Sequence, residues 1–324
     1  MIRRLLLLAL LSLFPLMSKA ACPSPNATAS FGTATTFVVN TTPSTTSTTV
    51  SVNCGAGGTL TLLGTDTIVF RLTGATVVSA SRGIMKRSGD TGTDNIPVRL
   101  CVDSACATEL RVNGTSYTFN SASLLTLLAG AQLNFNIPLY LRTVPGQTIA
   151  AGTYNVTLNL SATYNICTSL NLLGLCLGAQ TGTNVVPIAT TIVVSNDCTT
   201  ITAPNVNFGS APLVGSFSSV SQTINVICSK GSTYTVGLSN GSYASGNVRN
   251  MANGVNRLSY EIYKGTSSNR WGASGTERWS STTSTSVSSD GLTRGYNYTA
   301  RILTTQSTPP AGNYSDSVVV DLAF

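Results

Sequence analysis

The chain has 324 residues, with eight cysteines, no histidine and a formal net charge of +7 at pH 7. Without histidine, Ser-His-Asp and Cys-His catalysis and the usual catalytic zinc sites are excluded, so we expect no enzyme, no metal and no cofactor. Arg3, Arg4 and Lys19 supply three of the positive charges (7 − 3 = 4), and the other basic residues form no run, which argues against a nucleic-acid partner.

Residues 1–20 have the pattern of a secretory signal peptide. A basic start precedes the apolar residues 5–17, and Ser18, Lys19 and Ala20 form a small-x-small cleavage site. The apolar run has about 13 residues, whereas a bilayer needs about 20, so a membrane anchor is disfavoured. We expect the mature chain to begin at Ala21. A lipoprotein anchored at Cys22 is the alternative, but the residues before it lack the aliphatic side chain of lipoprotein signals.

The mature sequence contains an internal repeat, which divides it into residues 21–196 and residues 197–324. In each half a cysteine is followed by a Phe-Gly pair, and then by a period-2 apolar run that ends in a second cysteine. The shared landmarks are Cys22, Phe31-Gly32 and residues 49–54 in the first half, and Cys198, Phe208-Gly209 and residues 223–228 in the second.

The even number of cysteines behind a signal peptide favours disulfides. The repeat makes Cys22 with Cys54 and Cys198 with Cys228 natural pairs. Each pair would join the first two strands of its domain. Two close pairs would each pin a loop, although eight cysteines allow 105 pairings and the sequence leaves the connectivity open. These close pairs are Cys101 with Cys106 and Cys167 with Cys176.

Short alternating runs separated by Gly, Asn, Ser and Thr dominate both halves and predict two antiparallel β-sandwiches. In the first half, residues 154–166 alternate as one long strand, and residues 184–194 supply a following strand to pair with it. The second half has one such strand, after which the sequence ends. We therefore expect the first domain to be self-complete and the second to lack its last strand. The apolar residues of that one strand, which we expect to form an exposed groove for a partner strand, are Val318, Val320, Leu322 and Phe324.

The second half also contains an ordered set of motifs. Arg249-Asn250-Met251 is followed by residues 258–263, then by Arg270-Trp271-Gly272 and residues 311–316. In this order they resemble the signature of the spore coat protein U domain, a family found in subunits of archaic, Csu-type chaperone–usher pili. The resemblance covers about residues 198–324. The first half shares with it only the cysteine frame and the phrase at residues 151–154.

The resemblance implies immunoglobulin-like sandwiches that lack their last strand. It also implies a periplasmic pilus chaperone that lends a strand, an outer-membrane usher, and an adjacent subunit that later donates its own strand. Only Ala21 precedes Cys22, so this chain has no strand of its own to donate. The arrangement resembles a two-domain tip adhesin, exported through the periplasm to the cell surface at the tip of a fimbrium, which attaches cells to surfaces in biofilm formation.

Three leucine-rich runs are candidates for binding a hydrophobic surface or an unknown receptor, because exposed apolar clusters mark interaction surfaces. The best candidate lies between the first domain's last two strands, in the loop closed by Cys167 and Cys176. The alternative for each run is burial in the core, as a strand or a short helix. The candidate residues are Leu170, Leu172, Leu173, Leu175 and Leu177, then Leu60, Leu62 and Leu63, and finally Leu124, Leu125, Leu127 and Leu128.

Two other functions are weighed against a tip adhesin. One is a structural pilin or coat subunit, which would bury the leucine runs between subunits. The other is a free-standing carbohydrate-binding surface protein, with Tyr263, Trp271 and Trp279 as a sugar-stacking platform, although core packing is favoured for these rings. Asp90 and Asp94 are the nearest carboxylate pair for a glycosidase, but their Gly-Thr loop favours a role in a turn.

Overall fold

A computed structural model of the chain describes residues 22–55, 66–89, 92–129, 132–168, 171–172, 175–176 and 178–324. These residues form two compact units. The first comprises the described residues up to Gly32 with Pro43–Pro145 and Thr153–Ile192, and the second comprises Thr33–Thr42, Gly146–Gly152 and Val193–Phe324. Among the described residues, no helix is long and apolar enough to cross a membrane.

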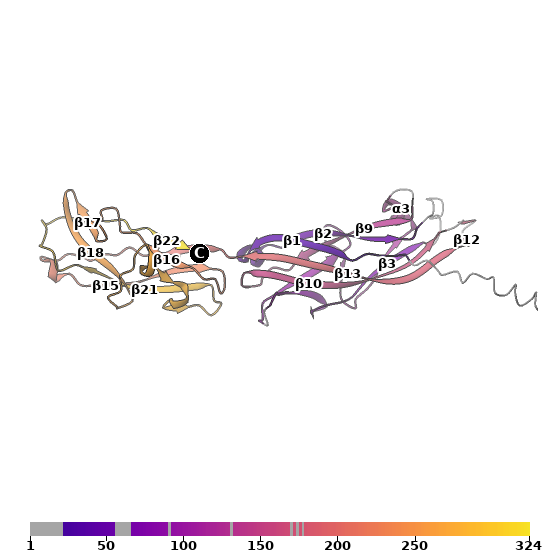
Figure 1. Ribbon diagram of the computed structural model, residues 1–324, viewed down its shortest axis with the longest axis horizontal. Helices are drawn as coiled ribbons and strands as arrows, with labels where there is room; N and C mark the ends of the chain where they lie inside the picture. The colour runs from indigo at the N-terminus through magenta and orange to yellow at the C-terminus, as the bar shows by residue number, and fades with distance from the viewer. Residues whose placement is uncertain are drawn as a thin grey trace, which may run out of the picture. The chain divides into compact units, whose positions relative to one another are not determined.

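The first unit is built on one hydrogen-bonded sheet of eleven strands, whose main path runs β1-β13-β10-β5-β6-β9-β2 (Figure 1). β3 pairs with β10 and β8, β4 with β5, and β7 with β6. The strands are β1 (Ala27–Thr35), β2 (Thr45–Asn53), β3 (Thr67–Ala75), β4 (Val78–Ser79), β5 (Arg82–Arg87), β6 (Asn95–Cys101), β7 (Glu109–Leu110), β8 (Tyr117–Asn120), β9 (Asn134–Thr143), β10 (Gly152–Cys167) and β13 (Ala179–Ser195).

This sheet folds over its own core. Alternate residues of the long strand β10 are buried from Tyr154 to Ile166, as the period-2 pattern predicts. The two ends of the path, β1 and β2, approach each other, since the Thr48 hydroxyl donates to the Thr28 carbonyl oxygen at 2.8 Å. A separate hairpin pairs β11 (Asn171–Leu172) with β12 (Leu175–Cys176). The chain also has two six-residue helices, α3 (Ser121–Thr126) in the first unit and α2 (Thr36–Thr41), which belongs to the second unit.

The second unit contains two sheets around one core. A six-stranded sheet has the order β14-β15-β21-β18-β17, with β20 beside β21, and a three-stranded sheet has the order β19-β16-β22. Buried residues from both sheets form a single cluster with Trp271 and Tyr296 inside it. The strands are β14 (Cys198–Thr202), β15 (Val220–Cys228), β16 (Thr235–Leu238), β17 (Arg249–Asn253), β18 (Asn256–Lys264), β19 (Trp279–Ser280), β20 (Ser286–Val287), β21 (Thr293–Ile302) and β22 (Val320–Ala323); the 3₁₀ turns are η2 (Val214–Ser216), η3 (Gly275–Glu277) and η4 (Ser281–Thr283).

The prediction of an all-β chain with two β domains is confirmed. The disulfides are also the pairs that the sequence favoured: Cys22–Cys54, Cys101–Cys106, Cys167–Cys176 and Cys198–Cys228. The Cys22–Cys54 disulfide occupies the thiol that a lipid anchor would use, which argues against the lipoprotein alternative.

Candidate functional site

The strand β22 of the second unit has one paired edge and one open edge. β22 pairs with β16 in antiparallel register, and just before it the Ser239 N–H donates to the Val319 carbonyl oxygen at 2.9 Å. Antiparallel alternation then directs the main-chain N–H and C=O groups of Val320 and Leu322 away from β16. Within the described part of the chain, no other strand pairs with β22. The open edge therefore presents main-chain donors and acceptors to an incoming strand.

An apolar groove runs along this edge. It consists of two adjoining cavities of about 650 and 400 Å³, which share Val206, Phe208, Met251 and Tyr314 in their linings. One wall is formed by residues that precede and begin β22, and the other by residues 203–208, which follow β14. All four shared residues are only partly buried, although they pack against the core. Their remaining apolar surface would be removed from water by a strand placed in the groove.

The first unit has a strand at the corresponding position. There β13 lies between β10 and β1. The repeat in the sequence makes β22 the counterpart of β10. It makes residues 203–209, which follow β14 and contain Phe208-Gly209, the counterpart of β1, which contains Phe31-Gly32. The groove between β22 and the residues after β14 is thus the position that β13 occupies in the first unit.

A polar contact holds one wall of the groove in place. The Tyr260 hydroxyl donates to Asp316 Oδ2 at 2.7 Å, and the Ser242 N–H donates to Asp316 Oδ1 at 2.8 Å. Burial, together with the neighbouring Asp316 carboxylate, raises the pKa of Tyr260, so the phenol stays protonated and can donate. Gly241 has a φ of +84°, and a Cβ there would lie 1.9 Å from Asp316 Oδ2, so this close approach requires glycine.

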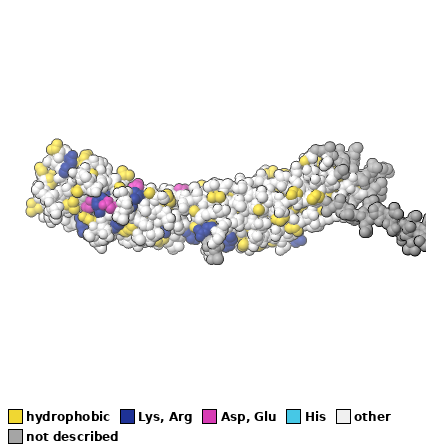
Figure 2. Space-filling view, in the orientation of Figure 1, with side chains coloured by type: hydrophobic (Ala, Val, Ile, Leu, Met, Phe, Trp, Pro, Cys, Tyr) yellow, Lys and Arg dark blue, Asp and Glu magenta, His cyan; other side chains and the backbone are white. Residues whose placement is uncertain are grey.

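A buried ionic network lies behind the groove. The fully buried Arg249 pairs with Glu261, and its guanidinium also donates to the carbonyl oxygens of Leu238 and Trp271, at 3.0 and 2.8 Å. Arg270 Nε donates to the same Glu261 at 2.7 Å, and Arg270 also pairs with Glu277. Figure 2 shows basic and acidic side chains, dark blue and magenta, side by side on the surface of the second unit. The network joins β16, β17 and β18 to the segment that contains Trp271.

Burial and charge have opposite effects on the two arginines of this network. Burial lowers the pKa of Arg249, although the Glu261 carboxylate partly offsets the effect. Burial also acts to lower the pKa of Arg270, but there the hydrogen bonds and charges of Glu261 and Glu277 outweigh it and the pKa is raised. At Gly272 a Cβ would lie 1.9 Å from Glu277 Oε2, so a side chain there would disrupt the pair. The motif residues Arg249, Arg270 and Gly272 therefore have a structural explanation.

Only some of the residues predicted for the groove line it. Val318 and Val320 line it, as expected. Leu322 packs against the core but is not in the lining, and Phe324 is 70% exposed, with its ring 6.0 Å from that of Tyr234. Phe324 lies one residue beyond the end of β22 at Ala323, and its place in the groove stays a prediction.

Sequence reasoning missed the opposite wall of the groove. Val206 and Phe208 lie in a segment without regular strand pairing, and Met251 follows the motif arginine. The repeated Phe-Gly landmark contained the signal for Phe208, but its role could not be inferred without the sheet around it.

The leucine runs are described only in part. Leu60, Leu62, Leu63, Leu170, Leu173 and Leu177 lie outside the described residues. Leu172 and Leu175 are opposite each other in the β11–β12 hairpin.

The third run forms the helix α3 and its C-terminal turn. Leu125 is 40% exposed, and Leu127 and Leu128 are half-buried. Leu124, however, is fully buried, because the helix that begins at the Asn120 cap turns this side chain into the core. Its assignment as a surface-binding residue is wrong.

Of the aromatic residues considered for sugar binding, the two tryptophans belong to the core instead, whereas Tyr263 is half-buried with Arg301 over its ring. Trp271 is 0% and Trp279 9% exposed, and their rings contact each other edge to face at 4.9 Å. Asp90 lies outside the described residues, and Asp94 accepts a hydrogen bond from Tyr154 at 3.4 Å. The described residues contain no group of three or more Cys, Asp or Glu side chains placed to hold a metal ion.

Comparison with known families finds one match. The family model described as Spore Coat Protein U domain matches residues 9–161 and 184–321. Both halves of the chain are thus matched, whereas in the sequence the first half shared with the family only the cysteine frame and the phrase at residues 151–154. A search of curated proteins finds no match.

Comparison with solved structures shows that the chain has the fold of a known pilus protein. The tip-adhesin complex CsuC–CsuE, a pre-assembly complex from archaic chaperone–usher Csu pili of Acinetobacter baumannii, matches with a TM-score of 0.57 and 23% identity over 94% of this chain and 99% of that chain. The CupB6 tip adhesin of Pseudomonas aeruginosa has a TM-score of 0.31 and 12% identity over 86% of each chain. CfaE, the adhesive subunit of CFA/I fimbria of enterotoxigenic Escherichia coli, has a TM-score of 0.29 and 16% identity over 47% of this chain and 41% of that chain.

Proposed function

The chain belongs to the spore coat protein U domain family, and from this premise we propose that it is the tip adhesin of an archaic, Csu-type chaperone–usher pilus. The observation that carries the proposal is the apolar groove beside the open edge of β22, at the position that β13 fills in the first unit. A groove of this kind binds a partner by β-strand addition.

The second unit is the part that joins the pilus. A periplasmic chaperone lends a strand to the groove, and at the outer-membrane usher an adjacent subunit replaces it with its own. Main-chain hydrogen bonds to Val320 and Leu322 provide affinity, and alternate apolar side chains of the donor pack on Val206, Phe208 and Met251. The assembled protein is exported to the cell surface, at the pilus tip.

The first unit is the part that attaches. Its leucine runs bind a hydrophobic surface, and this contact serves biofilm formation. Support comes from the exposed Leu125 and from the β11–β12 hairpin, which sets Leu172 opposite Leu175 next to the Cys167–Cys176 disulfide. Many pili acting together multiply a modest contact at each tip.

The proposal is tested by expressing the chain in the periplasm with and without a chaperone of the same pilus system. We expect a one-to-one complex when the two are expressed together, and degraded or aggregated protein when the chain is expressed alone, because the open edge and the apolar groove favour aggregation. Size-exclusion chromatography and intact mass measure the outcome. A stable monomer without the chaperone would refute strand acceptance.

A second arm supplies the missing strand within the chain. Residues 184–194, which include the core of β13, are appended after Phe324 through a short Gly-Asn linker. We expect a chaperone-independent monomer, because a complementary strand buries the groove and pairs with β22. The matched control carries serine in the appended copy at the positions of Val186, Ile188 and Ile192, whose side chains are buried in β13. If the control is equally soluble, groove filling is not the cause.

A further inference from the structure

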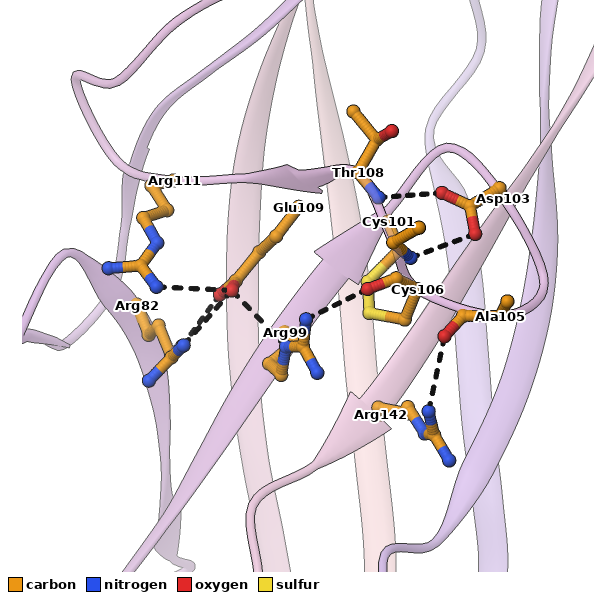
Figure 3. Close-up of a disulfide and its surroundings, with 11 residues drawn as sticks. Arg82, Arg99, Cys101, Asp103, Ala105, Cys106, Thr108, Glu109, Arg111 and Arg142 are labelled. Atoms are coloured by element: carbon orange, nitrogen blue, oxygen red, sulfur yellow. Dashed lines mark hydrogen bonds and ion pairs between the residues drawn. A yellow bond between two sulfur atoms is a disulfide. The ribbon is translucent and has the colours of Figure 1, made fainter.

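A row of arginines crosses the outer face of the first unit. Arg142 on β9 lies opposite Arg99 on β6 and opposite Thr45 on β2. The next residue on β9, Leu141, is buried, so Arg142 and its cross-strand neighbours face outward. Figure 3 shows Arg99 and Arg142 on the two sides of the loop closed by Cys101–Cys106.

Three arginines near this loop share one carboxylate. Arg82 donates to Glu109 at 2.6 Å, Arg99 at 3.2 Å and Arg111 at 3.5 Å. Burial alone would raise the pKa of Glu109, but the hydrogen bond from Arg82 and the three positive charges outweigh burial and lower it. Glu109 is therefore ionised, and the group as a whole retains an excess of positive charge.

Arg142 is not part of that group. Its Nη1 donates to the Ala105 carbonyl oxygen at 3.3 Å, and its buried Nε has no hydrogen-bond partner among the described residues. The facing residue Arg99 carries the same charge, and like charges directly opposite each other on a sheet are destabilising. A bound anion that pairs with the Arg142 guanidinium would offset this repulsion.

The loop beside Arg142 is held in a fixed position. Arg99 Nη2 donates to the Cys106 carbonyl oxygen at 2.9 Å. The Asp103 carboxylate accepts from the N–H groups of Ala107 and Thr108, at 2.9 and 2.7 Å, and these bonds lower its pKa. Asp103 is the charged residue of this loop, and its carboxylate oxygens accept hydrogen bonds from main-chain N–H groups.

A cavity of about 390 Å³ opens at this place. Its lining residues include Arg142 and Tyr140, together with the hydroxyl-bearing Thr45, Ser47 and Ser104. Hydroxyl groups and the face of an aromatic ring suit a sugar ring, and a guanidinium suits a carboxylate. The volume lies within the range of small-ligand sites.

We propose that this cavity binds a carboxylate-bearing sugar of an acidic polysaccharide, with Arg142 holding the carboxylate. The site lies at β2, β9 and the loop closed by Cys101–Cys106, and its residues are neither in the leucine runs nor in the strand groove. It would give the first unit a second mode of attachment, charged and saturable, beside apolar contact.

The test measures binding of tetragalacturonate by isothermal titration calorimetry, using the full mature chain in the complex in which it purifies. We expect saturable binding that weakens as salt is added, no binding of the neutral galactotetraose, and about tenfold weaker binding by Arg142→Gln, because a charge-assisted hydrogen bond is lost. The matched control is Arg71→Gln, since Arg71 is an exposed arginine on β3 of the same unit, outside the row.

Other results would overturn the proposal. Equal weakening by Arg71→Gln would indicate attraction to net charge alone, and equal binding of both oligosaccharides would remove the role of the carboxylate. Binding to phosphatidylglycerol vesicles without binding of tetragalacturonate would assign the arginines to a membrane surface instead. Should Arg142→Gln fail to fold, Ser47→Ala tests the same cavity from β2 and is expected to weaken binding by about threefold.

Discussion

The two units of this chain differ most at one strand position. In the first, β13 lies between β10 and β1 and buries Val186, Ile188 and Ile192. In the second, the corresponding place is a groove whose wall residues Val206 and Phe208 remain partly exposed. The first unit has this strand and its sheet is complete. The second unit has no strand there among the described residues, so it presents apolar surface and unpaired main-chain groups.

The two units also differ in how exposed their ion pairs are. Each has a glutamate whose side chain is 8% exposed, Glu109 in the first unit and Glu261 in the second. The partners of Glu109 are 23% to 53% exposed, whereas Arg249 beside Glu261 is fully buried. The first unit therefore places its ions at the surface, where a ligand can reach them. The second uses its ions to fix the walls of the groove.

The largest expected effect is on attachment, which should depend on the first unit alone. The double variant Leu172→Ser/Leu175→Ser removes the apolar pair of the β11–β12 hairpin. Because each leucine contributes about 1.5 to 3 kcal/mol on burial and tips act multivalently, we expect attachment of piliated cells to polystyrene to fall by more than about tenfold.

Pilus number and chaperone binding should stay unchanged in that variant, since both depend on the second unit. Electron microscopy of the cells and pull-down with the chaperone check them. Leu125→Ser tests α3 in the same assay. Attachment that persists in the hairpin variant would show that the hairpin leucines do not bind the surface.

A separate effect, on stability instead of attachment, is expected in the first unit when its own strand is weakened. Ile188→Ser and Ile192→Ser each place a hydroxyl in the core and leave a cavity, at a cost of about 3 to 5 kcal/mol. Val193→Ser is the matched control, because Val193 is 44% exposed on the same strand, and should change stability by less than about 0.5 kcal/mol.

Spectroscopy can assign this loss to one unit. Both tryptophans of the chain, Trp271 and Trp279, belong to the second unit. Urea unfolding followed by far-ultraviolet circular dichroism should therefore show the change, whereas the tryptophan fluorescence transition should stay in place. If the fluorescence transition moves by the same amount, the units do not unfold independently and the comparison between them fails.

The sequence predicted what depends on local pattern. Alternation from residue 154 to residue 166 predicted β10, because it follows from period-2 geometry. The repeat favoured the pairs Cys22–Cys54 and Cys198–Cys228, although it left the connectivity open. Leu124 was misjudged since α3 has only six residues, too few for a helical period to be visible. The wall formed by Val206 and Phe208 was missed because this segment is shaped by tertiary contacts and not by strand pairing.

The finest test of the comparison contrasts the two glutamate networks. Arg249→Met leaves Glu261 with Arg270 but removes the donor to the carbonyl oxygens of Leu238 and Trp271, deep in the unit. Breaking a buried pair in this way costs about 3 to 5 kcal/mol. Arg82→Met leaves Glu109 with two other arginines near solvent, so we expect about 1 kcal/mol or less.

The measured quantity is the difference between these two variants, about 2 to 4 kcal/mol in the free energy of unfolding. Tryptophan fluorescence follows the second unit, and circular dichroism, to which both units contribute, shows in addition the transition of the first. A chaperone pull-down should also show that Arg249→Met weakens strand acceptance, because β16, the partner of β22, loses its anchor at Leu238. Equal losses in both variants would mean that the buried ions do not hold the groove open. The wall would then be held by apolar packing and by the contact between Tyr260 and Asp316.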